Sequence, residues 1–355
     1  MGRACPARSV LVSPFMRFRV PISRPVAAVL VASVGLATAL PASAATRRAR
    51  RGARSVAQVV LPASASAWDM AVGQAARNGL GRAQGAVVAM DPRTGRVHAL
   101  VNPALGMQRA FQPCSVFKIV VGIAGLSEGV ITPETTHRCT RGCWMWAGHG
   151  PVDLKRALAV SCNPYFEWVG EQLGYEKVQR YARLLGLGEL TGINLTGESA
   201  GRVPSFVRPE AVGHLSSHAT GIETSAVQLA VLVSATVNGG VILRPQMVGP
   251  QDFVPRERWR LPETTRLDGL AAGFAAAVNE GSASAAFDPE VAVAGKTGTC
   301  AQLGWFASYA PADDPQLVVV AFLRHGSGHG ASAVAGRIFR ELFGSGSGAT
   351  AAGMP

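Results

Sequence analysis

"FQPCSVFKIVV", residues 111–121, places a serine and a lysine three positions apart inside an apolar run. Positions i and i+3 of a helix are surface neighbours, so we expect Ser115 and Lys118 on one face of a helix that begins near the serine. Lysine is rare here, with four among 34 basic residues. An arginine stays protonated, whereas a buried lysine can lose its proton. Lys118 is therefore a candidate base for the Ser115 hydroxyl.

Two further motifs carry polar side chains that could complete such a site. "SCN" supplies Ser161 and Asn163 near a helix start, where a hydroxyl could relay a proton and an amide could bind the lysine and a substrate carbonyl. "KTGT" ends an apolar strand, and such a strand end can hold a carboxylate and pair with a peptide. Its residues are Lys296, Thr297, Gly298 and Thr299. Alone, each motif also fits a structural interpretation, a capping serine or a strand bulge.

The remaining patterns predict an α/β (α+β) chain whose sheet is assembled from both ends of one domain. Residues 85–101 are typical of two strands around the turn "DPRTG", and residues 291–325 of three more. Residues 115–238 are mostly helical by spacing, and residues 331–344 predict a helix that could cover the sheet. We expect a five-stranded antiparallel sheet flanked by helices, with an inserted all-helical lobe and a cleft between lobe and sheet.

The ends of the chain differ in composition from this domain. Residues 1–44, with Met1 or Met16 as the start, combine arginines, an apolar run and "PASAA", which is typical of a cleaved export signal. The alternative is an uncleaved anchor, because the apolar run could span a bilayer. Residues 45–66 predict a basic flexible linker, 67–343 the folded domain and 344–355 a disordered Gly/Ser tail. We expect a periplasmic or other extracytoplasmic location, with or without attachment to the inner membrane.

The net charge of +12 at first suggests a nucleic-acid or membrane binder. Residues 1–54 contain ten arginines and no acidic residue, which leaves 12 − 10 = +2 for the rest of the chain. The folded part is therefore nearly neutral and shows no basic stripe with interleaved aromatic residues. Nucleic acid is not expected as a partner, and no cofactor is expected.

The three motifs occur in the order "SVFK", "SCN" and "KTGT", and "GLGELTGINLTGESAGRVP" and "WFASYAP" accompany them. In these motifs the chain resembles the transpeptidase domain of penicillin-binding proteins over most of residues 84–343. The resemblance implies that Ser115 attacks the D-Ala-D-Ala bond of peptidoglycan stem peptides. It implies Lys118 as the base, Ser161 as the proton relay and Asn163 as a partner of the lysine and of the substrate amide.

The same resemblance implies a carboxylate site at Lys296, Thr297 and Thr299, and an oxyanion hole made by the N–H groups of Ser115 and Thr299. Stem peptides are the expected substrates, and β-lactams are expected as covalent inhibitors or substrates. Transpeptidase, carboxypeptidase and endopeptidase activities stay open. Two alternatives are a serine β-lactamase, for which we find no water-activating Glu and Asn pair, and a non-catalytic β-lactam sensor.

Cys114 and Cys300 depart from the small residues usual in the family at these two positions. If the helix start and the strand face each other, as the implied mechanism requires, the two sulfurs are neighbours. The same motif offsets resemble a bridge in class A carbapenem-hydrolysing β-lactamases. We therefore expect a Cys114–Cys300 disulfide.

Cys139 and Cys143 lie in "HRCTRGCWMW" and are expected to form a second disulfide, because exported proteins reside in an oxidising compartment. The alternative is a zinc site made by these cysteines with His137 and His149. Cys162 then remains a buried thiol between two site residues. No metal is expected on the preferred assignment.

Overall fold

A computed structural model describes residues 57–141, 143 and 147–345 of the chain. The predicted export segment, most of the predicted linker and nearly all of the predicted tail lie outside these residues. Among the helices that are described, none has both the length and the apolar character needed to cross a membrane.

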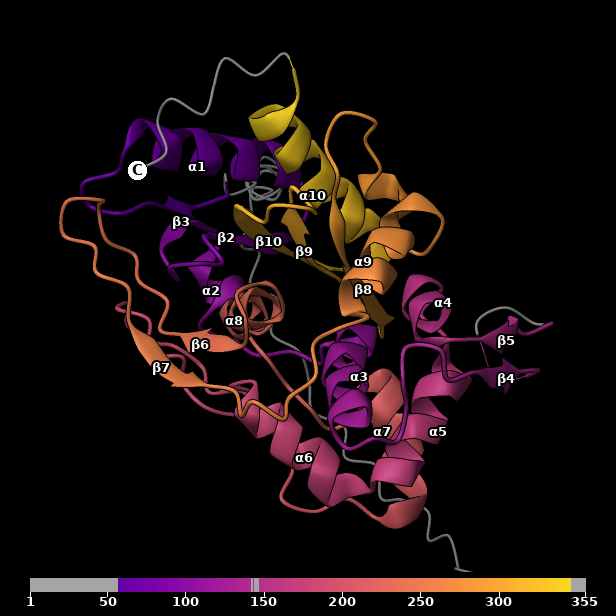
Figure 1. The fold of residues 1–355 in the computed structure, drawn as a ribbon. Helices are drawn as coiled ribbons and strands as arrows, with labels where there is room; N and C mark the ends of the chain where they lie inside the picture. Colours follow the sequence, from indigo (N-terminus) through magenta and orange to yellow (C-terminus); the bar gives the residue numbers. More distant parts are fainter. Residues whose placement is uncertain (1–56, 142, 144–146, 346–355) are drawn as a thin grey trace, which may run out of the picture. The chain divides into compact units, whose positions relative to one another are not determined.

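The strands predicted at the two ends of the domain form one antiparallel sheet (Figure 1). In spatial order, its strands are β1 (Val59–Val60), β3 (Val97–Val101), β2 (Gly85–Met90), β10 (Leu317–Arg324), β9 (Leu303–Ala310) and β8 (Ala294–Cys300). The five predicted strands are all present. The sixth strand, β1, lies in the stretch predicted as linker, where two residues pair with β3. Strand β8, which carries "KTGT", is an edge of the sheet.

Side chains alternate between the two faces of this sheet, and each face packs against helices. Helices α1 (Ala67–Leu80) and α10 (Gly328–Phe343) cover one face (Figure 1) and share a buried apolar cluster with Val87 and Ala89. The opposite face packs against α8 (Ala226–Val237), an apolar helix that contacts β2, β9 and β10. The sheet is thus buried on both sides, as the nearly continuous apolar composition of its strands requires.

The residues between β3 and β8 form the predicted helical lobe together with two short hairpins. The helices are α2 (Pro103–Gly106), α3 (Lys118–Ser127), α4 (Leu154–Ala159), α5 (Asn163–Leu173), α6 (Tyr175–Leu184), α7 (Val212–His218) and α9 (Leu270–Asn279), with 3₁₀ turns η1 (Cys114–Phe117), η2 (Pro209–Ala211) and η3 (Ser284–Ala286). The hairpins, which the sequence patterns did not indicate, pair β4 (His137–Cys139) with β5 (Gly150–Val152) and β6 (Val241–Leu243) with β7 (Glu257–Arg260).

A buried ionic cluster fixes α1 against β3. Asp69 also closes the capping box of α1 by accepting from the Ser66 backbone N–H. Its carboxylate pairs with Arg96, and its Oδ1 lies 2.7 Å from His98 Nδ1. Burial alone would raise the pKa of Asp69, but hydrogen bonds from His98 and Ser66 lower it to about 2. This carboxylate is therefore charged at neutral pH and is part of the stability of the fold.

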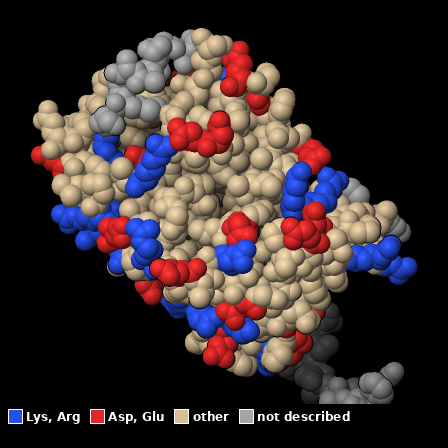
Figure 2. Space-filling view, in the orientation of Figure 1, with Lys and Arg blue, Asp and Glu red and all other residues tan. Residues whose placement is uncertain are grey.

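On the surface, basic and acidic side chains are interspersed on the face shown in Figure 2, without a broad area of one sign. This distribution agrees with the nearly neutral composition of residues after Arg54. A nucleic-acid groove would instead collect Lys and Arg along one stripe.

Candidate active site

Ser115 lies in η1, directly before α3, as the pattern of residues 111–121 predicts. The preceding residue, Cys114, has φ 54°, a conformation rare for residues other than glycine. A disulfide joins Cys114 to Cys300 at the end of β8, with their Cα atoms 5.7 Å apart. The helix start and the strand therefore face each other. Ser115 is half-buried, and its hydroxyl donates to Ser217 O at 3.5 Å.

Lys118 is the first residue of α3, and its side chain is fully buried. Its Nζ donates to Ser161 O at 2.7 Å, to Ser161 Oγ at 3.2 Å and to Asn163 Oδ1 at 2.6 Å. Burial lowers the pKa of Lys118 to about 7, so that a large fraction of the amine is neutral near neutral pH. Within the described residues no hydrogen bond joins Ser115 to Lys118. Proton transfer between them requires the serine hydroxyl to turn away from Ser217.

Ser161 lies between the two buried lysines of the site. Its Oγ is 3.2 Å from Lys118 Nζ and 2.9 Å from Lys296 Nζ. Its φ is 55°, and it lies in the turn that leads from α4 into α5. Burial lowers the pKa of Lys296 well below its usual range, and the neighbouring charge of Lys118 lowers it further. One hydroxyl thus connects two amines that can exchange protons.

Strand β8 places its motif residues on both sides of the sheet edge. A Cβ on Gly298 would lie 2.5 Å from Pro113 O. Glycine at this position therefore lets β8 approach the segment that leads into η1, in addition to the close approach of a substrate that the sequence suggested. Thr297 is buried, and its Oγ1 lies 2.6 Å from Ser282 Oγ. Thr299 is exposed, and its Oγ1 accepts from Gly328 N at 2.7 Å. The O–H of Thr299 therefore remains able to donate to an anion.

Helix α7 brings two polar side chains, His218 and Ser217, to this site that sequence reasoning missed. His218 Nε2 lies 3.3 Å from Asn163 Nδ2, and Ser217 Oγ donates to Glu167 Oε1 at 2.9 Å. Burial lowers the pKa of His218, and the nearby His214 and Lys118 lower it further, which keeps a ring nitrogen free to accept from the amide. No local signal marks these residues, because their contacts with "SVFK" and "SCN" are far apart in sequence.

Cys139 and Cys143 do not form the expected disulfide, so this prediction is wrong. The β4–β5 hairpin instead gathers both cysteines with His149 and Cys162. Cys139 Sγ lies 3.5 Å from His149 Nδ1, while the ring of His137 stacks on Trp168. Cys162 is buried, as expected, but it belongs to this group of side chains rather than filling space alone.

Comparisons with known proteins match this arrangement. The profile of the penicillin binding protein transpeptidase domain matches residues 85–344. Stage V sporulation protein D of Bacillus subtilis is 29% identical over 287 residues, which cover 65% of this chain and 44% of that protein. The peptidoglycan D,D-transpeptidase MrdA of Acinetobacter baumannii is 24% identical over 340 residues, covering 70% and 49%.

A crystal structure of Pseudomonas aeruginosa PBP2 in complex with WCK 5153 has the same fold, with a TM-score of 0.68, 23% identity and 78% coverage of each chain. The chain spans about half the length of the curated relatives described above. Because the family profile covers most of the chain and the three motifs meet in one site, the chain belongs to the penicillin-binding protein transpeptidase domain family.

Proposed function

We propose that this chain is a D,D-transpeptidase that acts on D-Ala-D-Ala stem peptides through an acyl-enzyme at Ser115 and is acylated by penicillin. One observation carries the proposal: two buried lysines converge on Ser161 Oγ. Lys118 Nζ lies 3.2 Å and Lys296 Nζ 2.9 Å from this oxygen, and the two lysines come from α3 and β8, the elements beside the candidate nucleophile. A buried amine of lowered pKa is costly for the fold, and such groups concentrate at catalytic sites.

In the proposed acylation, Ser115 Oγ attacks the carbonyl carbon of the penultimate D-Ala, and its proton passes to the neutral amine of Lys118. The N–H groups of Ser115 and Thr299 stabilise the oxyanion. As the tetrahedral intermediate collapses, the C–N bond breaks, and Ser161 passes a proton from Lys118 to the departing D-Ala amine. Asn163, held between Lys118 and His218, orients the lysine and binds the substrate amide.

Substrate binding is proposed along β8, whose free edge can pair with an extended peptide. The exposed Thr299 hydroxyl would hold the terminal carboxylate, and the buried Lys296 amine would add attraction when it is protonated. Because the Thr297 hydroxyl contacts Ser282, Thr297 would contribute through its backbone rather than its side chain. Gly298 would keep the strand close to the nucleophile.

We further propose that residues 1–44 direct export, so that the enzyme meets peptidoglycan outside the cytoplasm, either cleaved after Ala44 or held at the inner membrane. Residues 45–58 would then link this segment to the sheet. The Cys114–Cys300 disulfide is proposed to persist in the mature enzyme, since the exported compartment is oxidising.

The test is the intact mass of the purified protein after mixing with benzylpenicillin, followed over hours. The expected result is a lasting adduct of one penicillin that is absent from Ser115→Ala and present in Ser205→Ala, where an exposed serine is changed. Rapid loss of the adduct with accumulation of hydrolysed drug would instead indicate a β-lactamase. A Ser115→Ala protein that still forms the adduct would refute the assignment of the nucleophile.

Incubation with a stem peptide ending in D-Ala-D-Ala separates the remaining possibilities. Release of D-alanine with transfer to an added acceptor amine supports a transpeptidase, and release without transfer supports a carboxypeptidase. A penicillin adduct without any release of D-alanine supports a sensor.

A further inference from the structure

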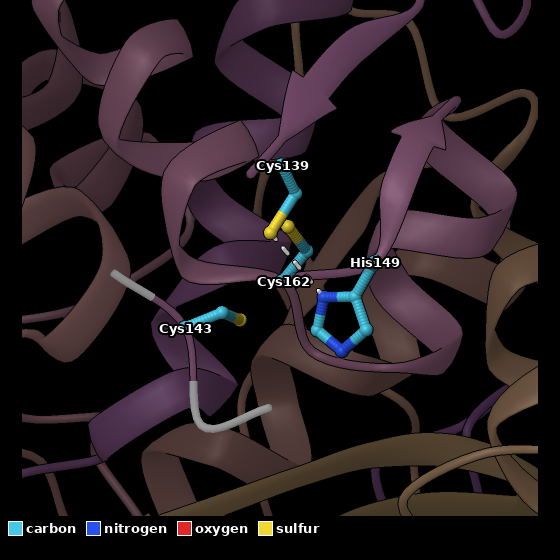
Figure 3. Close-up of side chains that lie close together, drawn as sticks. All are labelled: Cys139, Cys143, His149 and Cys162. Carbon is cyan, nitrogen blue, oxygen red and sulfur yellow. Dashed lines mark hydrogen bonds between the residues drawn. The ribbon is translucent and has the colours of Figure 1, made fainter. Parts of the chain in front are cut away.

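Three cysteines and one histidine, none of which has a role in the proposed acylation, lie together on the helical lobe. They are Cys139, Cys143, His149 and Cys162, and Figure 3 shows their sulfur and nitrogen atoms directed toward a common centre. Each offers one ligand atom, and all four atoms lie within 4.8 Å of one another. Cys139 and Cys162 are buried, and the other two are half-buried.

The spacing of these atoms fits a tetrahedral metal site. With Zn–S near 2.3 Å and Zn–N near 2.1 Å, a tetrahedral ion holds its sulfur and nitrogen ligands about 3.6 Å apart. Cys139 Sγ and His149 Nδ1 are 3.5 Å apart. The remaining atoms need to contract by about 1 Å at most to reach the S···S separation of about 3.8 Å in such a site. A shift of this size is within the reach of side-chain rotation.

The local sequence builds this arrangement through a glycine-flanked hairpin. Strands β4 and β5 pair Cys139 with Gly150, so that His149 returns beside Cys139. Gly148 and Gly150 both have positive φ, 72° and 70°, and a Cβ on Gly148 would lie 2.2 Å from Cys139 O. The hairpin is also anchored on α5, because the ring of His137 stacks on Trp168 with centroids 5.0 Å apart.

The chemistry of the donor set selects the ion. Three thiolates and one imidazole are soft and borderline ligands, which favour Zn²⁺ over Mg²⁺ or Ca²⁺, and Cys₃His is a common set for structural zinc. On binding, the three thiols lose three protons to solvent and form three Zn–S bonds, while the neutral imidazole donates its Nδ1 lone pair. No oxidant or reductant is involved.

We propose that Cys139, Cys143, His149 and Cys162 bind one Zn²⁺ ion. This site replaces both the expected Cys139–Cys143 disulfide and the expectation that the chain holds no metal. It also differs from the zinc alternative suggested by the sequence, since Cys162 takes the position that His137 would have had.

The place of Cys162 gives the zinc site a second consequence, which rests on the proposed function. Cys162 is the N-cap of α5 and lies between Ser161 and Asn163, the two residues that hold Lys118. A Zn–S bond at Cys162 would tie this segment to the β4–β5 hairpin. Zinc would thus act as a positioning device for the catalytic segment without touching the substrate.

The first test is the metal content of the full chain, purified without chelator, by inductively coupled plasma mass spectrometry. We expect about one zinc per chain in the wild type and in His137→Ala, the matched histidine of the same hairpin. His149→Ala should fall well below one, and His149→Cys, which keeps four ligands, should recover zinc. Substitution by Co²⁺ should give the absorption bands of a tetrahedral thiolate site.

Other results would overturn the zinc proposal. Protein that lacks zinc and takes up none from added ZnCl₂ after reduction with a phosphine would do so. So would peptide mapping that finds Cys139 joined to Cys143, or a His137→Ala variant that loses zinc while His149→Ala keeps it.

The second test separates zinc binding from catalysis. Removal of zinc with a chelator should slow acylation by benzylpenicillin at least tenfold at a temperature where circular dichroism shows the fold unchanged, and added Zn²⁺ should restore the rate. An unchanged rate in zinc-free protein would refute the positioning role while leaving the zinc site intact. If the zinc-bound wild type forms no penicillin adduct, the proposed function fails and the metal site stands.

Discussion

The strongest quantitative prediction concerns the pH dependence of acylation, because the proposed base is a fully buried amine. Burial lowers the pKa of Lys118 to about 7, and only the neutral amine can accept the Ser115 proton. A group of pKa 7 is about 9% neutral at pH 6 and about 91% neutral at pH 8. The acylation rate constant should therefore rise about tenfold between these pH values and level off above pH 8.

The measurement is the second-order rate constant for benzylpenicillin, from quenched samples analysed by intact mass across this pH range. Other titratable groups act on the amine, namely Cys162, Cys143, Glu167, Lys296 and His218. The pKa of His218 is lowered from its usual value, so its step should fall below that of Lys118. The profile of His218→Gln should keep the rise near pH 7.

Two lysine variants provide the matched comparison. Lys118→Arg keeps the positive charge but cannot deprotonate, and it should lose about 10²- to 10⁴-fold in rate at pH 8. Lys177→Arg changes a half-buried surface lysine whose Nζ lies 3.0 Å from Glu128 Oε2, and it should retain the wild-type rate and profile. A wild-type rate that is flat or falls between pH 6 and pH 8 would refute the assignment of Lys118 as the base.

Three further predictions concern stability and geometry. Replacing Cys114 and Cys300 by alanine removes a bridge with a sequence separation of 186, and urea unfolding should show a loss of up to about 5 kcal/mol; an unchanged midpoint would contradict this. Asp69→Asn breaks a buried ion pair and should lower the free energy of unfolding by about 3–5 kcal/mol. In the wild type, the lowering of the Asp69 pKa from 3.8 to about 2 contributes about 2 kcal/mol of stability, which is present above pH 4 and is lost as the pH falls toward 2. Acid unfolding of the two proteins measures this difference. Gly298→Ala should push β8 from η1 and slow acylation by about 10²-fold, whereas equal rates would show that the contact can relax.

The sheet could be predicted from the sequence because its signals are local. Residues 85–101 and 291–325 contain apolar runs separated by turn residues, and these became β2, β3, β8, β9 and β10. Strand β1 escaped prediction, since two valines at the end of a polar stretch carry no periodicity and pair only because β3 offers an open edge. The short hairpins escaped for the same reason: strands of three or four residues depend on the loops and helices around them.

In the candidate site, too, the local relations could be predicted from the sequence and the long-range contacts could not. Ser115 and Lys118 share a helical segment, so their relation follows from spacing alone. The contacts of Lys118 with Ser161 and Asn163 required the family resemblance, because nothing local says that α3 and α5 pack together. His218, which meets Asn163 from α7, had neither spacing nor motif to indicate it.

The cysteines show that the expected oxidising compartment predicts one disulfide of this chain correctly and another one wrongly. An oxidising location favours disulfides for any pair of cysteines, and it agrees with the bridge that joins Cys114 to Cys300. Cys139 and Cys143 are closer in sequence, yet they do not pair, because glycines beside His149 return that side chain to Cys139 and the turn before α5 brings in Cys162. Bound zinc would hold these three thiols as thiolates and protect them from oxidation. The oxidising compartment and the metal site are therefore compatible, and the position of the fourth ligand decides between a disulfide and a metal.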